Sequence, residues 1–520
     1  MAQNNESETI IVPKIAISLP KPSRGCDVLQ RIVTSVPSSE KILSELHRHC
    51  WRVERAGRAA LIVDAADYFR LARKAMCGAQ KQILLVGWDF DTRICLDYEA
   101  DDGGPTELGA FISWLTRERP GLGIYILKWD VGAIQLLGRG TTVLRLARWV
   151  RNPDVHFKLD AAHALGASHH QKIVVIDDSL AFCGGIDMTG DRWDTRGHRD
   201  GDGHRKRPTT GRRYGPWHDA TMAVDGKVAA ALGKLARDRW KAAGGAPIDP
   251  PEAANHPWPD ALDPHFRDVD IAIARTRSEH GEQKSVREIE GLFLAMIQGA
   301  ERFVYAENQY FASRVIAEAI VERLKEPDPP EFVIVNPRTG SGWLDEEAMS
   351  PARAELMKLI AEHDSHGRFR IYCPVTEARD DIYVHSKIMI VDDRQLRVGS
   401  ANLNNRSMGL DSECDLMIDA RLPANAGAGE TIAMLRADLL AEHLGCKPQA
   451  VAASFAETGS LIATIEALRS RDGRALVPFE PDAPNKVERA LAEKELLDPE
   501  SADGDFEPLA RPGLLARLKR

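Results

Sequence analysis

The chain has 520 residues, of which 43% are apolar and 28% charged, and its formal net charge is −9. This length has room for two domains or one large duplicated domain, and the composition is ordinary for a soluble globular protein. The acidic balance argues against nucleic acid as a general partner, and the eight cysteines show no CxxC pairing that would indicate a zinc site or a disulfide framework. No run is long and apolar enough for a transmembrane helix, and the first ten residues lack the basic start and apolar core of an export signal.

Helices and strands alternate along the first half of the chain. Residues 1–40 mix Pro, Ser and short apolar runs, and we expect them to form an extended arm. From about Ile42 to Ala79 apolar residues recur at helical spacing, which predicts a helical region. The elements predicted next are a buried strand from Gln82, a helix over 107–118, a strand over 123–130, a helix from Ile134 to Val150 and a strand over 155–159. This alternation indicates an α/β fold.

The stretch HHQKIVVIDD, at residues 169–178, is the first candidate for chemistry. Ile173–Ile176 is β-branched throughout and suits a strand that is buried on both faces. Because side chains alternate along a strand, His170 and Lys172 share one face at its start. An imidazole with a usable proton affinity beside an ammonium makes a receptor for a phosphoryl group. The His-x-Lys-x4-Asp pattern, which ends at Asp177, is short enough to occur by chance when it stands alone.

A basic insertion follows at residues 195–215, and it carries Arg and Lys side chains among Gly and Pro. These side chains are Arg196, Arg199, Arg205, Lys206, Arg207, Arg212 and Arg213. The segment can be a solvated, mobile insertion, or a basic flap that meets phosphate or an anionic membrane surface. Asp219 comes directly after it, in the stretch HDATMAVDG.

The second half of the chain retraces the first, beyond a junction at residues 244–279 that is rich in Pro, Asp and Ala. A helix and a strand within residues 286–311 parallel the early helix and strand. The strand PEFVIVNP at 330–337 matches GIYILKWD, and RFRIYCPV at 368–375 matches VHFKL.

The stretch YVHSKIMIVDD repeats the first motif 215 residues later, with His385, Lys387 and Asp392 at the same spacing. The agreement continues beyond the motif, because Gly184, Gly185 and Asp187 are matched at this offset by Gly399, Ser400 and Asn402. SECDLMIDA then places Glu413 where the first half has Asp219. Agreement over such a length indicates an internal duplication.

The duplication predicts two similar α/β halves that are related by a pseudo-two-fold axis, with central mixed sheets flanked by helices and one shared active site. We place the N-terminal half at 41–243, with its motif at about 164–191, and the C-terminal half at 280–445, with its motif at about 379–406. Residues 446–520 are expected to form a C-terminal tail, in which Asn485–Arg520 is helical, partly loose and without chemistry of its own.

Two facing motifs suit phosphodiester exchange, which needs a nucleophile on one side of phosphorus and an acid at the leaving oxygen on the other. The two histidines supply both roles. Phosphate oxygens would be held by lysines and by groups of the following loops, and our candidates are Lys172, Lys387, Asn402, Ser400 and Gly185.

Carboxylates complete the predicted site. Asp219 and Glu413 are candidates to orient the imidazoles through their far nitrogens, and the alternative for both is salt bridging to arginines. Asp177 and Asp392 belong to the two motifs and are counted with the catalytic candidates. They lie at the far end of each strand on the opposite face, however, which favours the anchoring of turns. No carboxylate cluster with metal-ligand spacing accompanies the motifs, and two lysines supply positive charge, so we expect no metal or other cofactor.

HxKxxxxD twice, followed by GG and GS, resembles the phospholipase D superfamily. GGIDMTGDRWD, GPWHDATMAVDG, the DRW at 238–240, AENQYF and GSANLNNRS resemble motifs of its phosphatidylcholine-hydrolysing members, over about residues 60–445. The resemblance implies the fold of that family, with His170 as the nucleophile that forms a phosphohistidine intermediate. It implies that His385 protonates the leaving alcohol and then activates the water that releases phosphatidic acid, with transphosphatidylation as a side activity. Asp187 departs from its counterpart Asn402, and we expect it to be structural or a partner for Arg192.

Several alternatives stay open at this point. Glu307 and Asn308 in AENQYF can be site residues or turn caps, and the aromatic residues Trp88, Trp129, Tyr310 and Trp217 can form a choline-binding box or ordinary core. The competing functions are a nuclease or a phosphatidyltransferase similar to cardiolipin synthase, and an inactive lipid-binding protein. We expect a phospholipid at a membrane surface as the partner, no nucleic acid, no obligate protein partner and a monomer. The expected location is cytoplasmic or peripheral to a membrane, with leaderless export left open.

Overall fold

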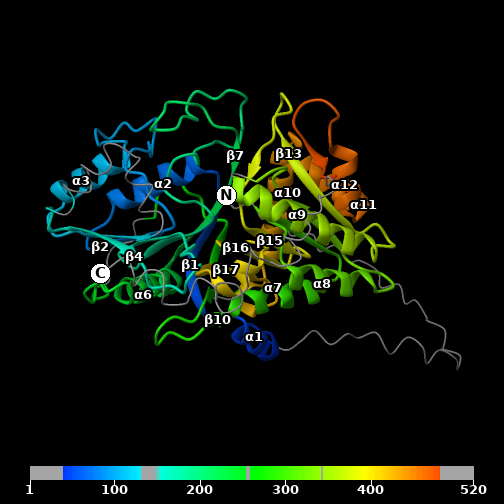
Figure 1. Ribbon diagram of the computed structural model, residues 1–520, viewed down its shortest axis with the longest axis horizontal. Helices are drawn as coiled ribbons and strands as arrows, with labels where there is room; N and C mark the ends of the chain where they lie inside the picture. Colours follow the sequence, from blue (N-terminus) through cyan, green and yellow to red (C-terminus); the bar gives the residue numbers. More distant parts are fainter. Residues whose placement is uncertain (1–38, 131–148, 150, 253–257, 341–342, 481–520) are drawn as a thin grey trace, which may run out of the picture. The chain divides into compact units, whose positions relative to one another are not determined.

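The computed structural model describes residues 39–130, 149, 151–252, 258–340 and 343–480 (Figure 1). The predicted arm at 1–40 and the predicted helix from Ile134 to Val150 therefore fall almost wholly outside the described residues, as does the tail beyond residue 480.

Short apolar runs form the strands of one continuous mixed sheet. The strands of the first half are β1 (Arg52–Val63), β2 (Gln82–Gly87), β3 (Gly123–Trp129), β4 (Val155–Asp160), β5 (Ile173–Ile176), β6 (Leu180–Gly184) and β8 (Ala220–Asp225). Those of the second half are β9 (Phe266–Arg277), β11 (Phe303–Glu307), β12 (Glu331–Val335), β13 (Phe369–Val375), β15 (Ile388–Val391), β16 (Gln395–Gly399), β17 (Glu413–Asp419) and β18 (Ala475–Pro478), and β10 (Val286–Arg287) pairs with β9. A separate two-stranded sheet joins β7 (Trp217–His218) to β14 (Tyr383–Val384).

The strands follow the same order in both halves when each half is followed outwards from the centre of the sheet. From β1 outwards the first half runs β8-β6-β5-β2-β3-β4, and from β9 outwards the second half runs β17-β16-β15-β11-β12-β13. The register repeats too, since Ala181 lies opposite Val224 in the first half and Leu396 lies opposite Ile418 in the second. β1 and β9 pair antiparallel and join the halves. The predicted α/β fold of two similar halves is confirmed, and the halves share a single sheet.

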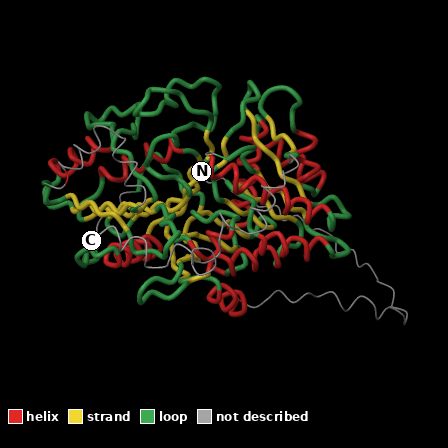
Figure 2. The backbone as a smooth tube through the Cα atoms, viewed as in Figure 1, coloured by secondary structure: helices red, strands yellow, loops and turns green. Residues whose placement is uncertain are grey.

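Helices cover both faces of this sheet (Figure 2). α6 (Gly226–Ala242), α10 (Ala428–Leu444), α11 (Pro448–Thr458) and α12 (Leu461–Leu468) pack on one core that runs through both halves. The opposite face is covered by α2 (Ala65–Cys77) and α3 (Leu108–Glu118) in the first half, and by α1 (Ser39–Arg48), α7 (Glu288–Gln298), α8 (Arg314–Leu324) and α9 (Trp343–Ala361) in the second. The short helices η1 (Arg406–Leu410) and η2 (Pro423–Asn425) flank β17.

The alternation of side chains explains this layering. In β5, Ile173 and Val175 belong to the shared core, whereas Val174 and Ile176 belong to the core beneath α2 and α3. All four residues of β5 are buried, so the prediction of a strand covered on both faces is confirmed.

Three sequence predictions about elements are wrong. The region Ile42–Ala79 contains the long strand β1 between α1 and α2, and the predicted junction at 244–279 contains β9. The Ala-rich sequence of β1 suits a helix as well as a strand, but pairing with β8 on one side and β9 on the other decides for the strand. The predicted tail also contributes to the fold, because β18 pairs antiparallel with β13.

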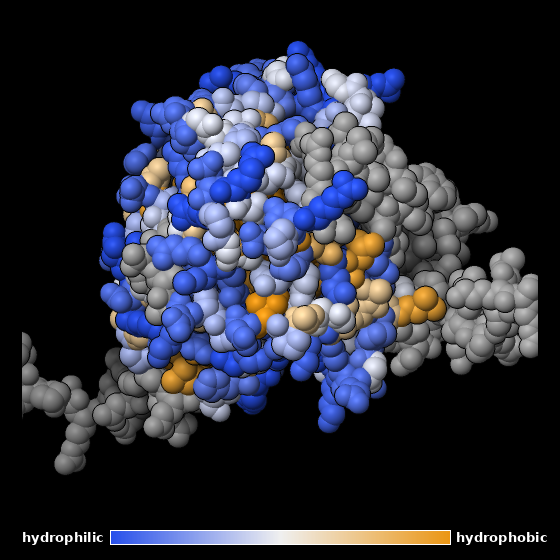
Figure 3. Space-filling view, turned by 90° about the vertical axis from the view of Figure 1, so that its left-hand side faces the viewer, coloured by the Kyte–Doolittle hydropathy of each residue, from blue (hydrophilic) through white to orange (hydrophobic). Residues whose placement is uncertain are grey.

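The face seen in Figure 3 is mostly hydrophilic, with apolar residues in small separate spots. Among the described residues, the large apolar side chains with substantial exposure are Tyr98, Leu159, Leu165 and Met434. No described helix has both the length and the hydropathy needed to cross a bilayer.

Candidate active site

The backbone joins each motif to the opposite half of the chain. His170 lies just before β5, and its N–H donates to the carbonyl of Ser412 over 2.9 Å. His385 lies just before β15, and its N–H donates to the carbonyl of His218 over 2.7 Å. The parallel pairing of β7 with β14 extends the second contact. The histidine of each motif is therefore hydrogen-bonded through its backbone to the residue just before the candidate carboxylate of the other half, Glu413 or Asp219.

The side chains complete this crossing. Nδ1 of His170 lies 3.0 Å from Oε1 of Glu413, and Nδ1 of His385 lies 2.6 Å from Oδ2 of Asp219. Both carboxylates are fully buried. Within the part of the chain that the structure describes, Nε2 of neither imidazole has a hydrogen-bond partner. Each ring is therefore fixed by a carboxylate of the other half through Nδ1, which leaves the lone pair or proton of Nε2 for chemistry.

The first of these carboxylates is held by two hydroxyl groups. Ser400 Oγ donates to Glu413 Oε2 over 2.5 Å, and Ser407 Oγ donates to Oε1 over 2.8 Å. Ser407 lies in the π-helix η1, and the sequence reasoning missed it. The hydroxyl of Ser400 therefore supports the orienting carboxylate, and its role in binding phosphate stays a prediction.

Gly185 leaves room for the other orienting carboxylate, that of Asp219. Its N–H donates to the carbonyl of Ala220 over 2.8 Å, so this amide is engaged within the sheet. A Cβ at this position would overlap Oδ1 of Asp219. Glycine is required here for the close approach of the carboxylate, and the phosphate contact through Gly185 stays a prediction.

The two lysines lie in different surroundings. Nζ of Lys172 forms a buried salt bridge of 3.0 Å with Oδ2 of Asp187. Nζ of Lys387 instead lies 3.4 Å from the amide oxygen of Gln309, and Asn402 occupies the place that corresponds to Asp187. Asp187 thus pairs with Lys172 and accepts from the N–H of Trp88, so of its two expected roles the structural one fits these contacts.

Burial and positive charge set the protonation of the site. Burial, reinforced by the ammonium groups of Lys172 and Lys387, lowers the pKa of His170 well below its ordinary value of 6.5. The pKa of His385 is lowered well below 6.5 by burial and then by Lys387, with Lys172 and His170 among the further causes, so the two halves act on each other's imidazoles.

Burial also shifts the pKa of three other groups of the site, always in the direction that disfavours the charged form. Burial raises the pKa of Glu413 to about 8 and that of Asp219 to about 7, and it lowers the pKa of Lys387 to about 7. Each imidazole–carboxylate pair can therefore take up or release one proton near neutral pH, as acid–base chemistry requires.

The acidic residues that end the motifs are turn anchors. The carboxylate of Asp177 accepts from the backbone N–H groups of residues 80, 81 and 82 over 2.7–2.8 Å. Asp392 accepts from residues 301, 302 and 303 over 2.7–2.8 Å. These contacts occupy both carboxylates at the start of β2 and β11. Asp177 and Asp392 therefore anchor turns, which is the alternative to the catalytic role for which they were also considered.

AENQYF supplies support for the site. Glu307 is fully buried and accepts from the hydroxyls of Tyr305 and Ser386 over 2.7 and 2.8 Å. Asn308 accepts from the N–H of Leu403 over 3.0 Å and from that of Tyr310 over 3.1 Å. Asn308 therefore has the turn-capping role that the sequence left open.

Three of the four aromatic residues considered for a choline box are divided between two places. Trp88 stacks on Trp129 with ring centroids 5.8 Å apart. Trp217 stacks on Tyr383, with the guanidinium of Arg192 4.4 Å from the Trp217 ring centroid. The face of Trp217 is thus occupied by a cation of the chain itself. Its ring centroid lies 5.2 Å from that of His385, so Arg192 is a cationic neighbour of the site that the sequence reasoning did not assign.

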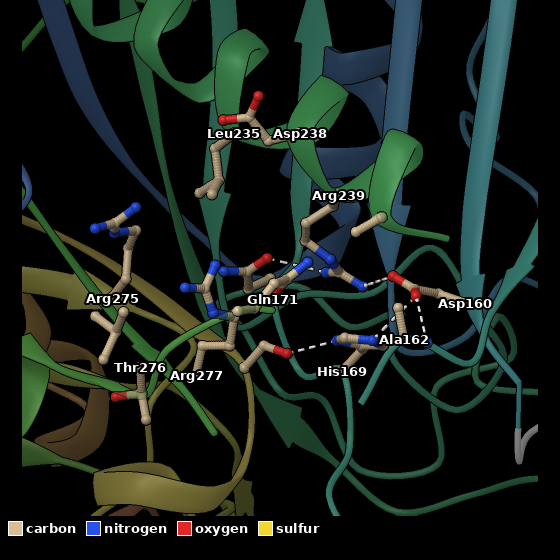
Figure 4. A pocket seen from close by; sticks show the side chains of 14 residues that line it. Asp160, Ala162, His169, Gln171, Leu235, Asp238, Arg239, Arg275, Thr276 and Arg277 are labelled. Atoms are coloured by element: carbon tan, nitrogen blue, oxygen red, sulfur yellow. Dashed lines mark hydrogen bonds and ion pairs between the residues drawn. The ribbon is translucent and has the colours of Figure 1, made fainter. Parts of the chain in front are cut away.

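A cavity of about 80 Å³ lies on the other side of the first motif (Figure 4). In Figure 4 the carboxylate of Asp160 lies between Arg239 and His169. Arg239 also donates to Gln171 over 2.9 Å, and Gln171 donates to the carbonyl of Glu413 over 3.0 Å. Since His169 and Gln171 flank His170 in sequence, this network fixes the motif from behind, and it gives the DRW stretch a structural role.

The basic insertion is anchored to the protein at several points. Arg205 is buried against Asp194 at 2.9 Å, and Arg196 donates to Glu442 of α10 over 2.5 Å. Arg207 pairs with Asp191 at 2.7 Å. The first alternative, a solvated insertion, therefore does not describe Arg196 and Arg205. The side chains that do face solvent are Arg199, Lys206, Arg207, Arg212 and Arg213.

One family model matches more than half of the chain. The family model described as Phospholipase D matches residues 75–317 and 347–471. Phospholipase D alpha 2 of Oryza sativa subsp. japonica is 25% identical over 517 residues, covering 71% of this chain and 62% of the relative. Phospholipase D A of Dictyostelium discoideum is 25% identical over 473 residues, covering 75% of this chain and 36% of the relative. The chain thus spans less than two thirds of the length of either relative. The crystal structure of phosphatidylserine synthase from Haemophilus influenzae Rd KW20 aligns with a TM-score of 0.49 and 13% identity, covering 75% of this chain and 90% of that chain.

Proposed function

The chain belongs to the phospholipase D family, and on this premise we propose that it hydrolyses the distal phosphodiester bond of glycerophospholipids such as phosphatidylcholine. The products are phosphatidic acid and the free headgroup alcohol. The observation that carries the proposal is the crossed arrangement in which His170 contacts Glu413 and His385 contacts Asp219, with both lysines at the same site.

In the first step Nε2 of His170 attacks phosphorus, while Glu413 accepts the hydrogen bond of Nδ1–H and stabilises the charge that develops on the ring. A P–N bond forms and the P–O bond to the headgroup breaks. His385 donates a proton from Nε2 to the departing oxygen, so the headgroup leaves as an alcohol. Lys172, Lys387 and Asn402 hold the nonbridging oxygens.

In the second step His385 acts as the base. It takes a proton from water as the water oxygen attacks phosphorus, and the P–N bond to His170 breaks, which releases phosphatidic acid and returns both rings to their starting state. A primary alcohol can replace water in this step, and the product is then a new phosphatidyl alcohol. The same geometry thus supports transphosphatidylation as a side activity.

The test is headgroup release from a panel of phospholipids, compared for the wild type, His170→Ala, His385→Ala and His204→Gln. His204 is half-exposed and pairs with Asp202, so it serves as a matched control. We expect both alanine variants to lose about 10³-fold or more in kcat, as is usual when a nucleophile or a general acid is removed, and the control to keep its rate.

A phosphatidyl ester with a nitrophenol leaving group separates the two roles. Nitrophenolate leaves without a proton, so His385→Ala should regain a large part of the first-step burst on this ester, whereas His170→Ala should not. Burst release by His170→Ala would refute its role as nucleophile. Plasmid DNA forms a parallel arm, and nicking of DNA without turnover of any lipid would replace the lipid proposal with the nuclease alternative.

A further inference from the structure

A second cluster of ionisable side chains lies directly behind the pair His385–Asp219. Its members are Asp64 after β1, His198 in the insertion, His218 in β7 and Glu442 in α10. Their side chains are 0–2% exposed. Three come from the first half and Glu442 from the second, so the cluster bridges the two halves of the fold.

One donor atom from each of the four residues lies within 4.8 Å of the other three, which is close enough for a shared ion. Nε2 of His198 lies 3.6 Å from Oδ2 of Asp64 and 3.1 Å from Oε1 of Glu442. Nδ1 of His218 lies 3.4 Å from Oδ1 of Asp64 and 2.9 Å from the same Glu442 oxygen. A tetrahedral Zn²⁺ with bonds of about 2.0–2.1 Å needs donors about 3.3–3.4 Å apart. The four separations, in which Asp64 uses one oxygen toward each histidine, lie within about half an ångström of that value.

Each histidine of the cluster also contacts a carboxylate through its other nitrogen. Nδ1 of His198 lies 3.0 Å from Asp194, and Nε2 of His218 lies 2.8 Å from Glu307. This arrangement of carboxylate, imidazole and ion recurs at zinc sites, where the outer carboxylate fixes the tautomer and strengthens the ligand.

Without an ion the cluster is poorly satisfied. A neutral imidazole has one N–H, yet both His198 and His218 meet carboxylates at both nitrogens. Oδ2 of Asp64 and Nδ1 of His218 are buried and lack a hydrogen bond among the described residues. Two buried imidazolium ions would be needed to pair all these oxygens, and one divalent cation would replace both extra protons without a change in net charge.

We propose that Asp64, His198, His218 and Glu442 bind one Zn²⁺ as a structural ion. Two imidazole nitrogens and two carboxylate oxygens are ligands that Zn²⁺ accepts, whereas Ca²⁺ and Mg²⁺ prefer oxygen alone. A neighbouring group of His218, Glu307 and His443 is a weaker candidate. It offers three donors, and hydroxyl groups already occupy both oxygens of Glu307.

The ion would hold Asp219 in place. The backbone N–H of Asp219 donates to Oδ1 of Asp64 over 3.1 Å, and the N–H of Asp64 donates to the carbonyl of Asp219 over 2.7 Å. His218 precedes Asp219 and accepts the N–H of His385 through its carbonyl. Four ligands fixed by one ion would therefore fix the carboxylate that contacts His385. None of the four contacts the reacting phosphate, so their role is one of positioning.

The test begins with the untagged wild-type chain, expressed with zinc in the medium and purified without chelator. Elemental analysis should find about one Zn²⁺ per chain. The chain expressed with cobalt should show the strong visible absorption of tetrahedral Co²⁺. Less than about a tenth of an equivalent of either metal would overturn the proposal whatever the variants do.

Variants then locate the ion. His198→Gln and Glu442→Gln each remove one ligand from a different half, and each should reduce the metal content about tenfold or more, with the control His204→Gln unchanged. Full metal content in a folded ligand variant would place the ion elsewhere and overturn the assignment. Removing the ion from the wild type with a chelator should lower Tm by several degrees, and addition of Zn²⁺ should restore it.

Discussion

At the scale of single residues, burial pushes the protonation of His170 and Glu413 in opposite directions. The imidazole is held neutral and the carboxylate is held protonated to a higher pH than in water. In the unfolded chain the same groups titrate at their ordinary values of 6.5 and 4.5. The pair therefore links stability to pH in a way whose sign can be worked out.

A raised folded pKa stabilises the protein below the unfolded pKa, and the benefit is lost as pH rises through the folded value. For Glu413 this loss extends from about 4.5 to about 8. The lowered pKa of His170 has the opposite effect, but only below 6.5. Between pH 6.5 and about 8 the loss from Glu413 is unopposed by its partner.

We therefore expect the free energy of unfolding to fall over this window and Glu413→Gln to remove about 2 kcal/mol of that fall, at about 1.4 kcal/mol per pH unit. Thermal unfolding at several pH values between 6.5 and 8 measures it. Glu430→Gln makes the same chemical change at an exposed residue of α10 and should keep the wild-type slope. An unchanged slope in Glu413→Gln would contradict the argument.

Sequence reasoning reached some of these residues and missed others for a physical reason. The repeat drew attention to Asp219 and Glu413, because corresponding residues of two copies occupy corresponding places. It could not point to Ser407 or to the four donors around His218, since these residues come from separate segments that only the folded chain brings together. A search for metal ligands by local spacing fails for the same reason.

At the scale of elements, two hairpins carry the motifs, and each has a glycine at the end of its second strand. Gly399 ends β16, where its N–H donates to the carbonyl of Lys387. Asp415 of β17 lies so close that a Cβ on residue 399 would overlap its carboxylate and come within 2.6 Å of its Cα. That carboxylate pairs with buried Arg397 and accepts from the N–H of Ser400 over 3.0 Å.

We expect Gly399→Ala to displace Asp415 and to destabilise the protein by about 3–5 kcal/mol, the usual cost of breaking a buried ion pair. Activity should also fall, since Ser400 follows directly and supports Glu413. Gly427→Ala is the control, because nothing lies within 4 Å of a Cβ there. Denaturant unfolding measures both variants, and a wild-type midpoint for Gly399→Ala would show that the hairpin tolerates the extra carbon.

The elements that were predicted correctly have strong local signals. β5 and β15 are short β-branched runs between turn residues, and their character does not depend on what surrounds them. β1 and β9 were missed because their pattern is ambiguous and their state depends on each other. Seven residues of β1 pair with β9, from Arg52 opposite Ile273 to Ala59 opposite Phe266.

At the scale of the whole molecule, duplication made the fold predictable, since one repeat explains the order and register of both halves. What it left open was how the halves join. The halves share a sheet because β1 and β9 would each be an unpaired edge strand without the other. No local sequence pattern indicates which edge strand of one half pairs with which edge strand of the other.

The crossed carboxylates predict that neither half is active alone. The chain can be opened after Glu252 and its two fragments produced separately or together. Each fragment alone lacks the carboxylate of its own histidine, so we expect headgroup release only when both are present. They should copurify, because β1–β9 and β7–β14 pair across the cut. Turnover by a single fragment would show that the crossed contacts are dispensable.

The salt bridge between Lys172 and Asp187 has a consequence for the orientation in which a substrate binds. A perfectly two-fold environment would let a diester enter in two equivalent orientations, with nucleophile and acid exchanging places between turnovers. Here one ammonium is neutralised by a neighbouring carboxylate, whereas its counterpart Lys387 faces an amide. An anionic substrate would therefore find different partners on its two sides: a lysine paired with a carboxylate on one side, and a lysine that contacts an amide on the other. The unequal pairing of the two lysines would let the site distinguish the two ends of a bound diester.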